Sequence, residues 1–242
     1  MTGTTYKRDL KLYEMLKGKT IAYVGPSPHL IGTNSGEKID SYDLVCRVGQ
    51  DFPLPENRMM DYGKRTDILL SSCNEPALKM LEPYADSDYF KNLKYVICPS
   101  KRLLPTGGNK EENFQKINKY NIPFHIIGKE YTNEIDDRFG CSATSGIAGI
   151  IALLNYELKE IYVTGITFYD MWQGNQTFEQ LHYPEYTEHH EKVGIARTIR
   201  AGIEFGHFQP PQILFFSCLL KRFNNITLDD FLKKYFKSIS VF

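Results

Sequence analysis

The sequence has no excess of charge of either sign, because 29 lysine and arginine residues balance 29 aspartate and glutamate residues. Proteins that bind nucleic acid use a surplus of basic side chains against its phosphates, so we expect no nucleic-acid partner. The sequence also lacks an apolar run long enough to cross a membrane, and residues 1–19 contain no apolar segment typical of a signal peptide. We therefore expect a soluble protein with no membrane-spanning segment.

Cysteine is scarce and follows no pattern. The chain has five cysteines, with no Cys-x-x-Cys pair and no cluster spaced like zinc ligands. Cys46, Cys98 and Cys218 lie in or beside apolar runs, as reduced core thiols do, and the other two are Cys73 and Cys141. We therefore predict a cytoplasmic protein without a metal site.

What the sequence does contain is an alternation of short apolar runs with longer amphipathic segments over 242 residues, a length that suits one domain spanning 1–242. The runs are rich in Val and Ile with little polar alternation, as in strands buried on both faces. We expect strands at 20–24, 44–48, 68–70, 95–98, 124–127, 161–164 and 213–216. We expect helices at 6–16, 75–81, 110–120, 145–155, 188–204 and 228–236. This order predicts an α/β protein with a Rossmann-type, mostly parallel sheet of about seven strands and helices on both faces.

The segment 141–170 carries the strongest functional signal. Thr144, Ser145 and Gly146 open an apolar helix, whose first N–H groups and positive dipole end can hold a phosphate without a metal. Thr167 and Tyr169 leave the strand that follows, and in a parallel sheet they would lie near that phosphate. The polar, aromatic segment at about 170–188 is predicted to be a lid-like loop over the site.

The turn after the first strand is a second candidate. Gly25 lets the backbone come close to a ligand, and the Ser27 hydroxyl can donate to a phosphate or ribose oxygen. The segment around Pro26 matches neither the dinucleotide-binding glycine pattern nor the P-loop. A plain proline-rich turn is the structural alternative.

Charged residues at two other strands allow two interpretations each. Arg47, near the end of a buried strand, either pairs with a carboxylate in the fold or faces an anionic ligand, because an unpaired buried guanidinium is costly. Asp67, which enters the third strand, has the same two interpretations.

Half of the six histidines, His182, His189 and His190, lie within nine residues of one polar segment. They are either exposed and structural or serve as a general base and phosphate ligands. A metal site is disfavoured because adjacent histidines cannot share one face of a helix. The triplet Asp86-Ser87-Asp88 is of the acid-x-acid type that binds metal in many glycosyltransferases, but its polar context predicts a solvated turn.

Taken in order, these segments resemble the sialyltransferases. IGTNSGEKIDSYDLVCRV and DYGKRTD resemble the long sialylmotif of the animal family. SATSGIAGIIALL with KEIYVTGITFYD resembles the short sialylmotif and, still more, the matching segment of bacterial sialyltransferases that act on lipooligosaccharide. His182-Tyr183-Pro184-Glu185 and His190-Glu191 resemble the family's later short motifs, so the resemblance covers about residues 20 to 205.

The resemblance implies a GT-A-like fold and an inverting, metal-independent transferase with no cofactor. Its donor would be a CMP-sugar and its acceptor a glycan or glycolipid hydroxyl. The implied general base is a histidine, in the order of preference His190, His189, His182. The implied nucleotide-binding residues are Gly25, Pro26, Ser27, Arg47, Asn74, Thr144, Ser145, Gly146, Thr167 and Tyr169.

The sequence departs from the family at two positions, where Pro26 and Gly49 replace asparagines expected near the nucleotide and donor sugar. Two alternatives therefore stay open. One is a metal-dependent transferase for another nucleotide sugar, with the metal at Asp86 and Asp88. The other is a non-catalytic module that binds a nucleotide or glycan.

Overall fold

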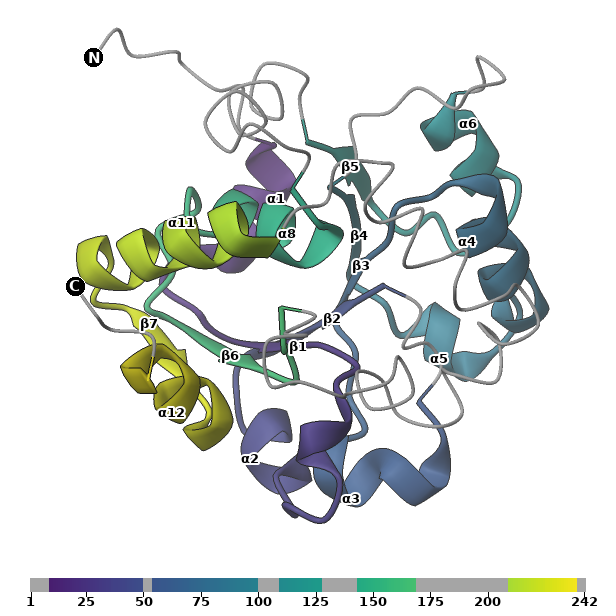
Figure 1. The fold of residues 1–242 in the computed structure, drawn as a ribbon. Helices are drawn as coiled ribbons and strands as arrows, with labels where there is room; N and C mark the ends of the chain where they lie inside the picture. The colour runs from purple at the N-terminus through teal and green to yellow at the C-terminus, as the bar shows by residue number, and fades with distance from the viewer. Residues whose placement is uncertain (1–8, 50–53, 100–108, 128–142, 169–208, 239–242) are drawn as a thin grey trace, which may run out of the picture.

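The computed structural model describes residues 9–49, 54–99, 109–127, 143–168 and 209–238, which contain one seven-stranded sheet with helices around it (Figure 1). The strand order is β5-β4-β3-β2-β1-β6-β7, and every neighbouring pair is parallel. The strands are β1 (Thr20–Val24), β2 (Leu44–Val48), β3 (Ile68–Leu70), β4 (Tyr95–Cys98), β5 (Phe124–Ile126), β6 (Glu160–Thr164) and β7 (Ile226–Leu228). The predicted α/β class and parallel sheet are confirmed.

Helices cover both faces of the sheet, as predicted. They are α1 (Leu10–Leu16), α2 (Gly36–Asp40), α3 (Met59–Tyr62), α4 (Glu75–Leu81), α5 (Asp88–Lys91), α6 (Lys110–Gln115), α8 (Ser145–Leu153), α11 (Gln209–Arg222) and α12 (Asp230–Ser238), with short 3-10 turns at Pro28–Leu30, Glu56–Arg58 and Glu82–Tyr84. None of the helices in these described parts is long and apolar enough to span a membrane.

The two faces follow from the alternation of side chains along each strand. On one face, Tyr23 of β1 and Cys46 of β2 join a cluster with α1, α8 and α11. On the other face, Val24 of β1 packs against the α2–α3 side, and Leu69 of β3 packs under α4, α5 and α6. Because β1 and β3 are both buried on each face, they read as unbroken apolar runs.

The strand predicted at 213–216 is wrong, because these residues lie in the helix α11. The apolar run begins after Pro210 and Pro211, and proline is tolerated in the first turn of a helix. Its buried positions Gln212, Ile213, Phe216 and Leu219 recur every three or four residues, which is the helical period. The seventh strand is instead the three-residue β7, which the sequence reading missed.

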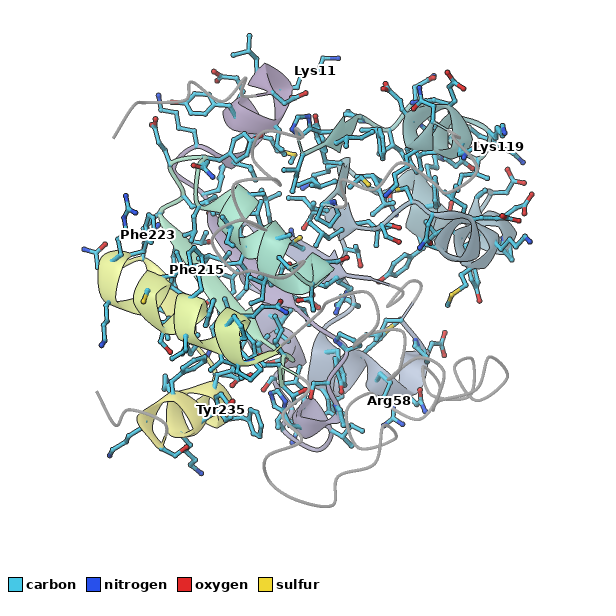
Figure 2. All side chains as sticks on the ribbon, turned by 45° about the horizontal axis from the view of Figure 1, so that its top comes forward. Lys11, Arg58, Lys119, Phe215, Phe223 and Tyr235 are labelled. Atoms are coloured by element: carbon cyan, nitrogen blue, oxygen red, sulfur yellow. The ribbon has the colours of Figure 1, made fainter. Side chains whose placement is uncertain are left out.

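The two last helices form one side of the molecule. In Figure 2, α11 and α12, which carry the labelled Phe215 and Tyr235, lie at the same side. Phe216 of α11 and Phe236 of α12 are in contact, with ring centroids 5.4 Å apart. Phe168, which follows β6, packs its ring on Phe216 at 5.3 Å, so the loop after β6 is anchored in this aromatic cluster.

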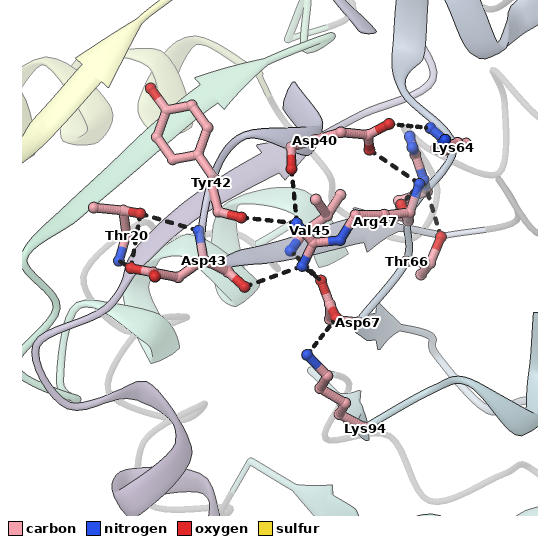
Figure 3. A network of polar contacts seen from close by, with 11 residues as sticks. Thr20, Asp40, Tyr42, Asp43, Val45, Arg47, Lys64, Thr66, Asp67 and Lys94 are labelled. Atoms are coloured by element: carbon pink, nitrogen blue, oxygen red, sulfur yellow. Dashed lines mark hydrogen bonds and ion pairs between the residues drawn. The ribbon is translucent and has the colours of Figure 1, made fainter. Parts of the chain in front are cut away.

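A polar network ties the strands together at their amino ends (Figure 3). Asp67 accepts hydrogen bonds from the Val45 N–H and the Arg65 guanidinium, both at 2.8 Å, and pairs with Lys94 at 2.7 Å. Asp43 accepts from the N–H and hydroxyl of Thr20, which lowers the pKa of this carboxyl group. Of the two interpretations left open for Asp67, the structure supports the structural one.

Candidate functional site

The direction of the chain across the sheet reverses between β1 and β6. From β1 the chain adds β2, β3, β4 and β5 on one side, whereas β6 and β7 lie on the other. In open parallel sheets, ligands bind beyond the carboxyl ends of the strands at such a switch point. The segments that leave these two ends are Gly25–Ser27 after β1 and Gly165–Phe168 after β6.

These two segments are in direct backbone contact. The Gly25 N–H donates to the Thr164 carbonyl, and the Ser27 N–H donates to the Gly165 carbonyl, both at 2.9 Å. A Cβ on Gly25 would lie 2.4 Å from the Gly165 oxygen, and one on Gly165, whose φ is +70°, would lie 2.2 Å from the Gly25 oxygen. Both glycines are therefore needed for the contact between the loops, a role that the sequence reading of Gly25 did not include.

Ser27 is buried, and each of its polar groups has a partner within the fold. Its carbonyl accepts from the Tyr62 hydroxyl at 2.6 Å, in addition to the contact of its N–H with Gly165. Its Oγ lies 2.9 Å from Nδ1 of His29, whose Nε2 lies 2.8 Å from Oδ2 of Asp229. A Ser–His–Asp chain thus runs from the loop after β1 to the residue that follows β7.

The first turn of α8 lies at the same edge of the sheet. Because α8 leads directly into β6, it runs antiparallel to the strands and its amino end points to their carboxyl ends. The Thr144 side chain caps this end by accepting from the Ile147 N–H, and a Cβ on Gly146 would meet Val48 at the end of β2 at 3.9 Å. Thr144, Ser145 and Gly146 are half-buried, so this turn is within reach of a ligand.

Two buried side chains hold α8 in place. The Tyr23 hydroxyl donates to the Gly146 carbonyl at 2.6 Å, and burial raises the pKa of this phenol well above its usual value. Gln212 of α11 accepts the Thr144 N–H at 2.9 Å. Gly149 makes room for the tyrosine, because a Cβ there would lie 2.4 Å from the Tyr23 oxygen.

Arg47 is fully buried, but on the other face of the sheet from α8. Its Nε donates to the Arg65 carbonyl and the Thr66 hydroxyl, both at 3.0 Å. One terminal nitrogen donates to the carbonyls of Tyr62 and Gly63, at 2.8 and 2.9 Å, and the other, Nη1, has no hydrogen-bond partner among the described residues. Of the alternatives expected for Arg47, pairing with a carboxylate is wrong, because the acceptors are backbone carbonyls and one hydroxyl. Through these bonds Arg47 fixes the loop between α3 and β3.

The remaining predicted nucleotide-binding residues divide into two groups. Pro26, Asn74 and Thr167 are half-buried at the carboxyl ends of β1, β3 and β6. Asn74 also caps α4 by accepting the Ala77 N–H at 3.0 Å. Tyr169 and the three histidines His182, His189 and His190 lie outside the described residues, as do the lid-like loop at 170–188 and the helix expected at 188–204.

The acidic triplet at 86–88 does not lie at the carboxyl edge of the sheet. It precedes β4 and so belongs to the edge formed by the amino ends of the strands. Asp86 pairs with Lys119, and the Ser87 hydroxyl caps the short α5. In the described parts of the chain, no three His, Cys, Asp or Glu side chains are grouped so that they could hold a metal.

The sequence reading missed four residues that shape the site: Tyr23, His29, Gln212 and Asp229. His29 stood inside a motif that was read for its serine, and Asp229 precedes a helix as a cap does, since its side chain accepts the Leu232 N–H at 2.8 Å. These local signals give no indication that the two side chains meet across 200 residues of sequence.

No protein-family model matches the chain, and no curated protein matches it. Among solved structures, a mammalian sialyltransferase has a TM-score of 0.52 at 17% identity, over 87% of this chain and 68% of that one. A mammalian sialyltransferase in complex with Gal-beta-1-3GalNAc-ortho-nitrophenol gives 0.44 at 18% identity, over 75% and 67%. The sialyltransferase CstII from Campylobacter jejuni, in complex with cytidine-5'-monophosphate, gives 0.41 at 19% identity, over 62% and 69%. The chain therefore has a fold that is also found in a sialyltransferase, in agreement with the resemblance of its motifs.

Proposed function

We propose that this protein is an inverting glycosyltransferase that moves sialic acid, or a related keto-sugar, from a CMP-sugar to a glycan hydroxyl without a metal. The observation that carries the proposal is the accessible first turn of α8 at the carboxyl edge of the sheet, beside the switch point between β1 and β6. The ordered sialylmotif-like segments and the shared fold give this edge its chemical interpretation.

The proposed reaction needs a place for the charge of its leaving group. When the acceptor oxygen bonds to the anomeric carbon, the bond between that carbon and the phosphate oxygen breaks, and its electron pair stays on CMP. The N–H groups at Ser145 and Gly146, together with the dipole of α8, would stabilise that anion. The proton of the acceptor hydroxyl would pass to a histidine, for which we propose His190, then His189, then His182.

The metal-dependent alternative has no structural support in its proposed residues. Its carboxylates, Asp86 and Asp88, belong to the amino edge of the sheet, and Asp86 already pairs with Lys119. Transfer that continues in an excess of chelator would support the metal-independent reaction, and loss of transfer in chelator would overturn this part of the proposal.

Calorimetric titration with CMP tests the nucleotide site directly. We expect binding in the micromolar to millimolar range, and an absence of heat at millimolar CMP would contradict the proposal. Release of CMP from CMP-sialic acid in the presence of glycan acceptors tests the reaction itself. Binding of CMP without transfer to any acceptor would instead favour the non-catalytic module.

The variant His190→Ala tests the proposed base. We expect turnover to fall by roughly a hundredfold or more while CMP binds as before, because the imidazole acts on the acceptor and not on the nucleotide. His125→Ala is the matched control, since His125 lies on the outer strand β5, four positions from β1 in the sheet. Unchanged turnover in His190→Ala would transfer the assignment to His189 or His182.

A further inference from the structure

We infer that His29 and Asp229 are positioning residues of the candidate nucleotide site. Asp229 fixes the tautomer of His29, and His29 accepts the hydroxyl hydrogen of Ser27. The chain of hydrogen bonds then holds the loop after β1 against the loop after β6. The inference rests on the proposed function. Neither His29 nor Asp229 is among the nucleotide-binding residues that the sequence predicts.

Asp229 is the fixed end of the chain because it is buried and both of its carboxylate oxygens accept hydrogen bonds. It is 7% exposed. Its Oδ2 accepts from the Thr164 hydroxyl at 2.7 Å and lies 3.3 Å from the Gly165 N–H, and its Oδ1 accepts from the Leu232 N–H at 2.8 Å. All of these partners are donors, so the carboxyl group is suited to its ionised form, which only accepts.

The direction of the hydrogen bonds at His29 follows from that charge. The hydrogen between the imidazole and the carboxylate belongs to Nε2, at 2.8 Å from Oδ2. In the neutral ring Nδ1 then carries a lone pair, so it accepts the hydroxyl of Ser27 at 2.9 Å. The His29 ring also stacks on Phe231, with centroids 4.2 Å apart, which limits its rotation.

Ser27 is the point at which the chain acts on the site. Its N–H is bound to Gly165 of the loop after β6, and its carbonyl is bound to Tyr62 of α3. Asp229 also binds the end of β6, because its carboxylate accepts a hydrogen bond from the Thr164 hydroxyl. The two loops that border the switch point are therefore fixed relative to each other before a ligand arrives, which removes the free-energy cost of ordering them from the binding step.

Two isosteric replacements of His29 divide the chain into its halves. His29→Asn keeps an acceptor oxygen near the position of Nδ1 but does not reach Asp229, whereas His29→Gln places an amide N–H near the position of Nε2 but offers nothing to Ser27. Because the chain works only when complete, we expect each variant to weaken CMP binding about tenfold. His125→Asn and His125→Gln, on the outer strand β5, are the matched controls and should bind CMP like the parent protein.

A merely structural role would show itself differently. In that case the His29 variants would melt at lower temperature, but the folded fraction, studied well below its melting temperature, would bind CMP with unchanged Kd. This result would overturn the inference. Should neither His29 variant fold, Ser27→Ala decides, because it removes only the hydroxyl and keeps both backbone contacts; we expect the same tenfold loss, and an unchanged Kd would contradict us.

A spectroscopic measurement tests the tautomer without any ligand. Long-range nitrogen–proton NMR spectra of the ligand-free protein should show His29 with a hydrogen on Nε2 and none on Nδ1, and Asp229→Asn should lose this preference. A ring protonated at Nδ1 in the parent protein would overturn the assignment of hydrogen-bond direction. If the parent protein binds no CMP, the proposed function fails and the positioning role fails with it; if the parent binds and the variants bind equally well, only the positioning role fails.

Discussion

At the scale of single residues, this protein uses buried polar groups to fix loop backbones. Arg47 is one of the largest fully buried side chains among the described residues, and its Nε and one terminal nitrogen donate to loop carbonyls. The sequence predicted that a buried arginine needs partners. It did not predict which ones, because every residue has a backbone carbonyl and residue types do not show which carbonyl accepts. The same holds for Gly25, whose close neighbour Gly165 lies on another strand end.

Replacing Arg47 by lysine should destabilise the fold by about 3 kcal/mol or more, since one ammonium group cannot serve the acceptors that the planar guanidinium binds, and unsatisfied buried carbonyls are costly. Urea denaturation measures this loss. Arg222→Lys, at the exposed end of α11, is the matched control and should stay within about 0.5 kcal/mol of the parent. Equal stability of the two variants would contradict the role given to Arg47.

Replacing Gly25 by alanine should lower the free energy of unfolding by about 1–3 kcal/mol, because the new Cβ would meet the Gly165 carbonyl oxygen and the backbone must move. Gly146→Ala serves as the control for stability, since the nearest described atom to its Cβ would be a Val48 methyl carbon at 3.9 Å, an ordinary contact distance. Thermal unfolding of both variants tests the contact. A stable Gly25→Ala protein would show that the two loops tolerate separation.

At the scale of secondary structure elements, the sequence predicted β1 to β4 residue for residue. These strands are dense in Val, Ile and Leu and are bounded by turn residues, which is the signature of a strand buried on both faces. The residues 213–216 have the same composition, so only the length of the apolar segment and its buried period distinguish helix from strand there. The Ser27–His29–Asp229 chain was beyond prediction, because it depends on which strand ends the fold brings together.

The helix α11 supports the candidate phosphate platform through one side chain. Gln212→Ala should loosen the first turn of α8, because the Thr144 N–H loses its acceptor. We expect the Kd for CMP to rise about fivefold, the equivalent of one neutral hydrogen bond, while cytidine binds as before because it has no phosphate. Ser217→Ala on the same helix is the control, since its hydroxyl donates to the Ile213 carbonyl of α11 itself.

Calorimetric titration with both ligands distinguishes the outcomes of the Gln212 experiment. A loss shared equally by CMP and cytidine would show that Gln212 supports the nucleoside or the fold as a whole. No loss with either ligand would show that α8 does not hold the phosphate.

At the scale of the whole molecule, the ionisation of Asp229 makes the free energy of unfolding depend on pH. Burial raises the pKa of Asp229, but the hydrogen bonds that its carboxylate accepts from His29, the Leu232 N–H and the Thr164 hydroxyl outweigh burial and hold the pKa below its ordinary value of 3.8. A carboxyl group with a lowered pKa in the folded state stabilises the fold above its unfolded pKa, and this contribution is lost as pH falls through the folded value.

The difference in unfolding free energy between the parent protein and Asp229→Asn should therefore be largest near neutral pH. It should begin to shrink as pH approaches 3.8 and should go on shrinking at lower pH, because protonation removes the same interactions in the parent. Urea titrations of both proteins at several pH values measure this difference. A gap that stays constant down to pH 3 would contradict the ionised state assigned to Asp229.

The place of β1 in the sheet has a consequence for biosynthesis. Among the strands that the structure describes, β1 comes first in the sequence and lies inside the finished sheet, between β2 and β6, yet β6 begins only at residue 160. Until then one edge of β1 presents unpaired backbone groups and apolar side chains, the combination that promotes aggregation of nascent chains. During translation, we therefore expect the incomplete chain to need rapid completion or chaperone binding at this strand, which borders the proposed nucleotide site.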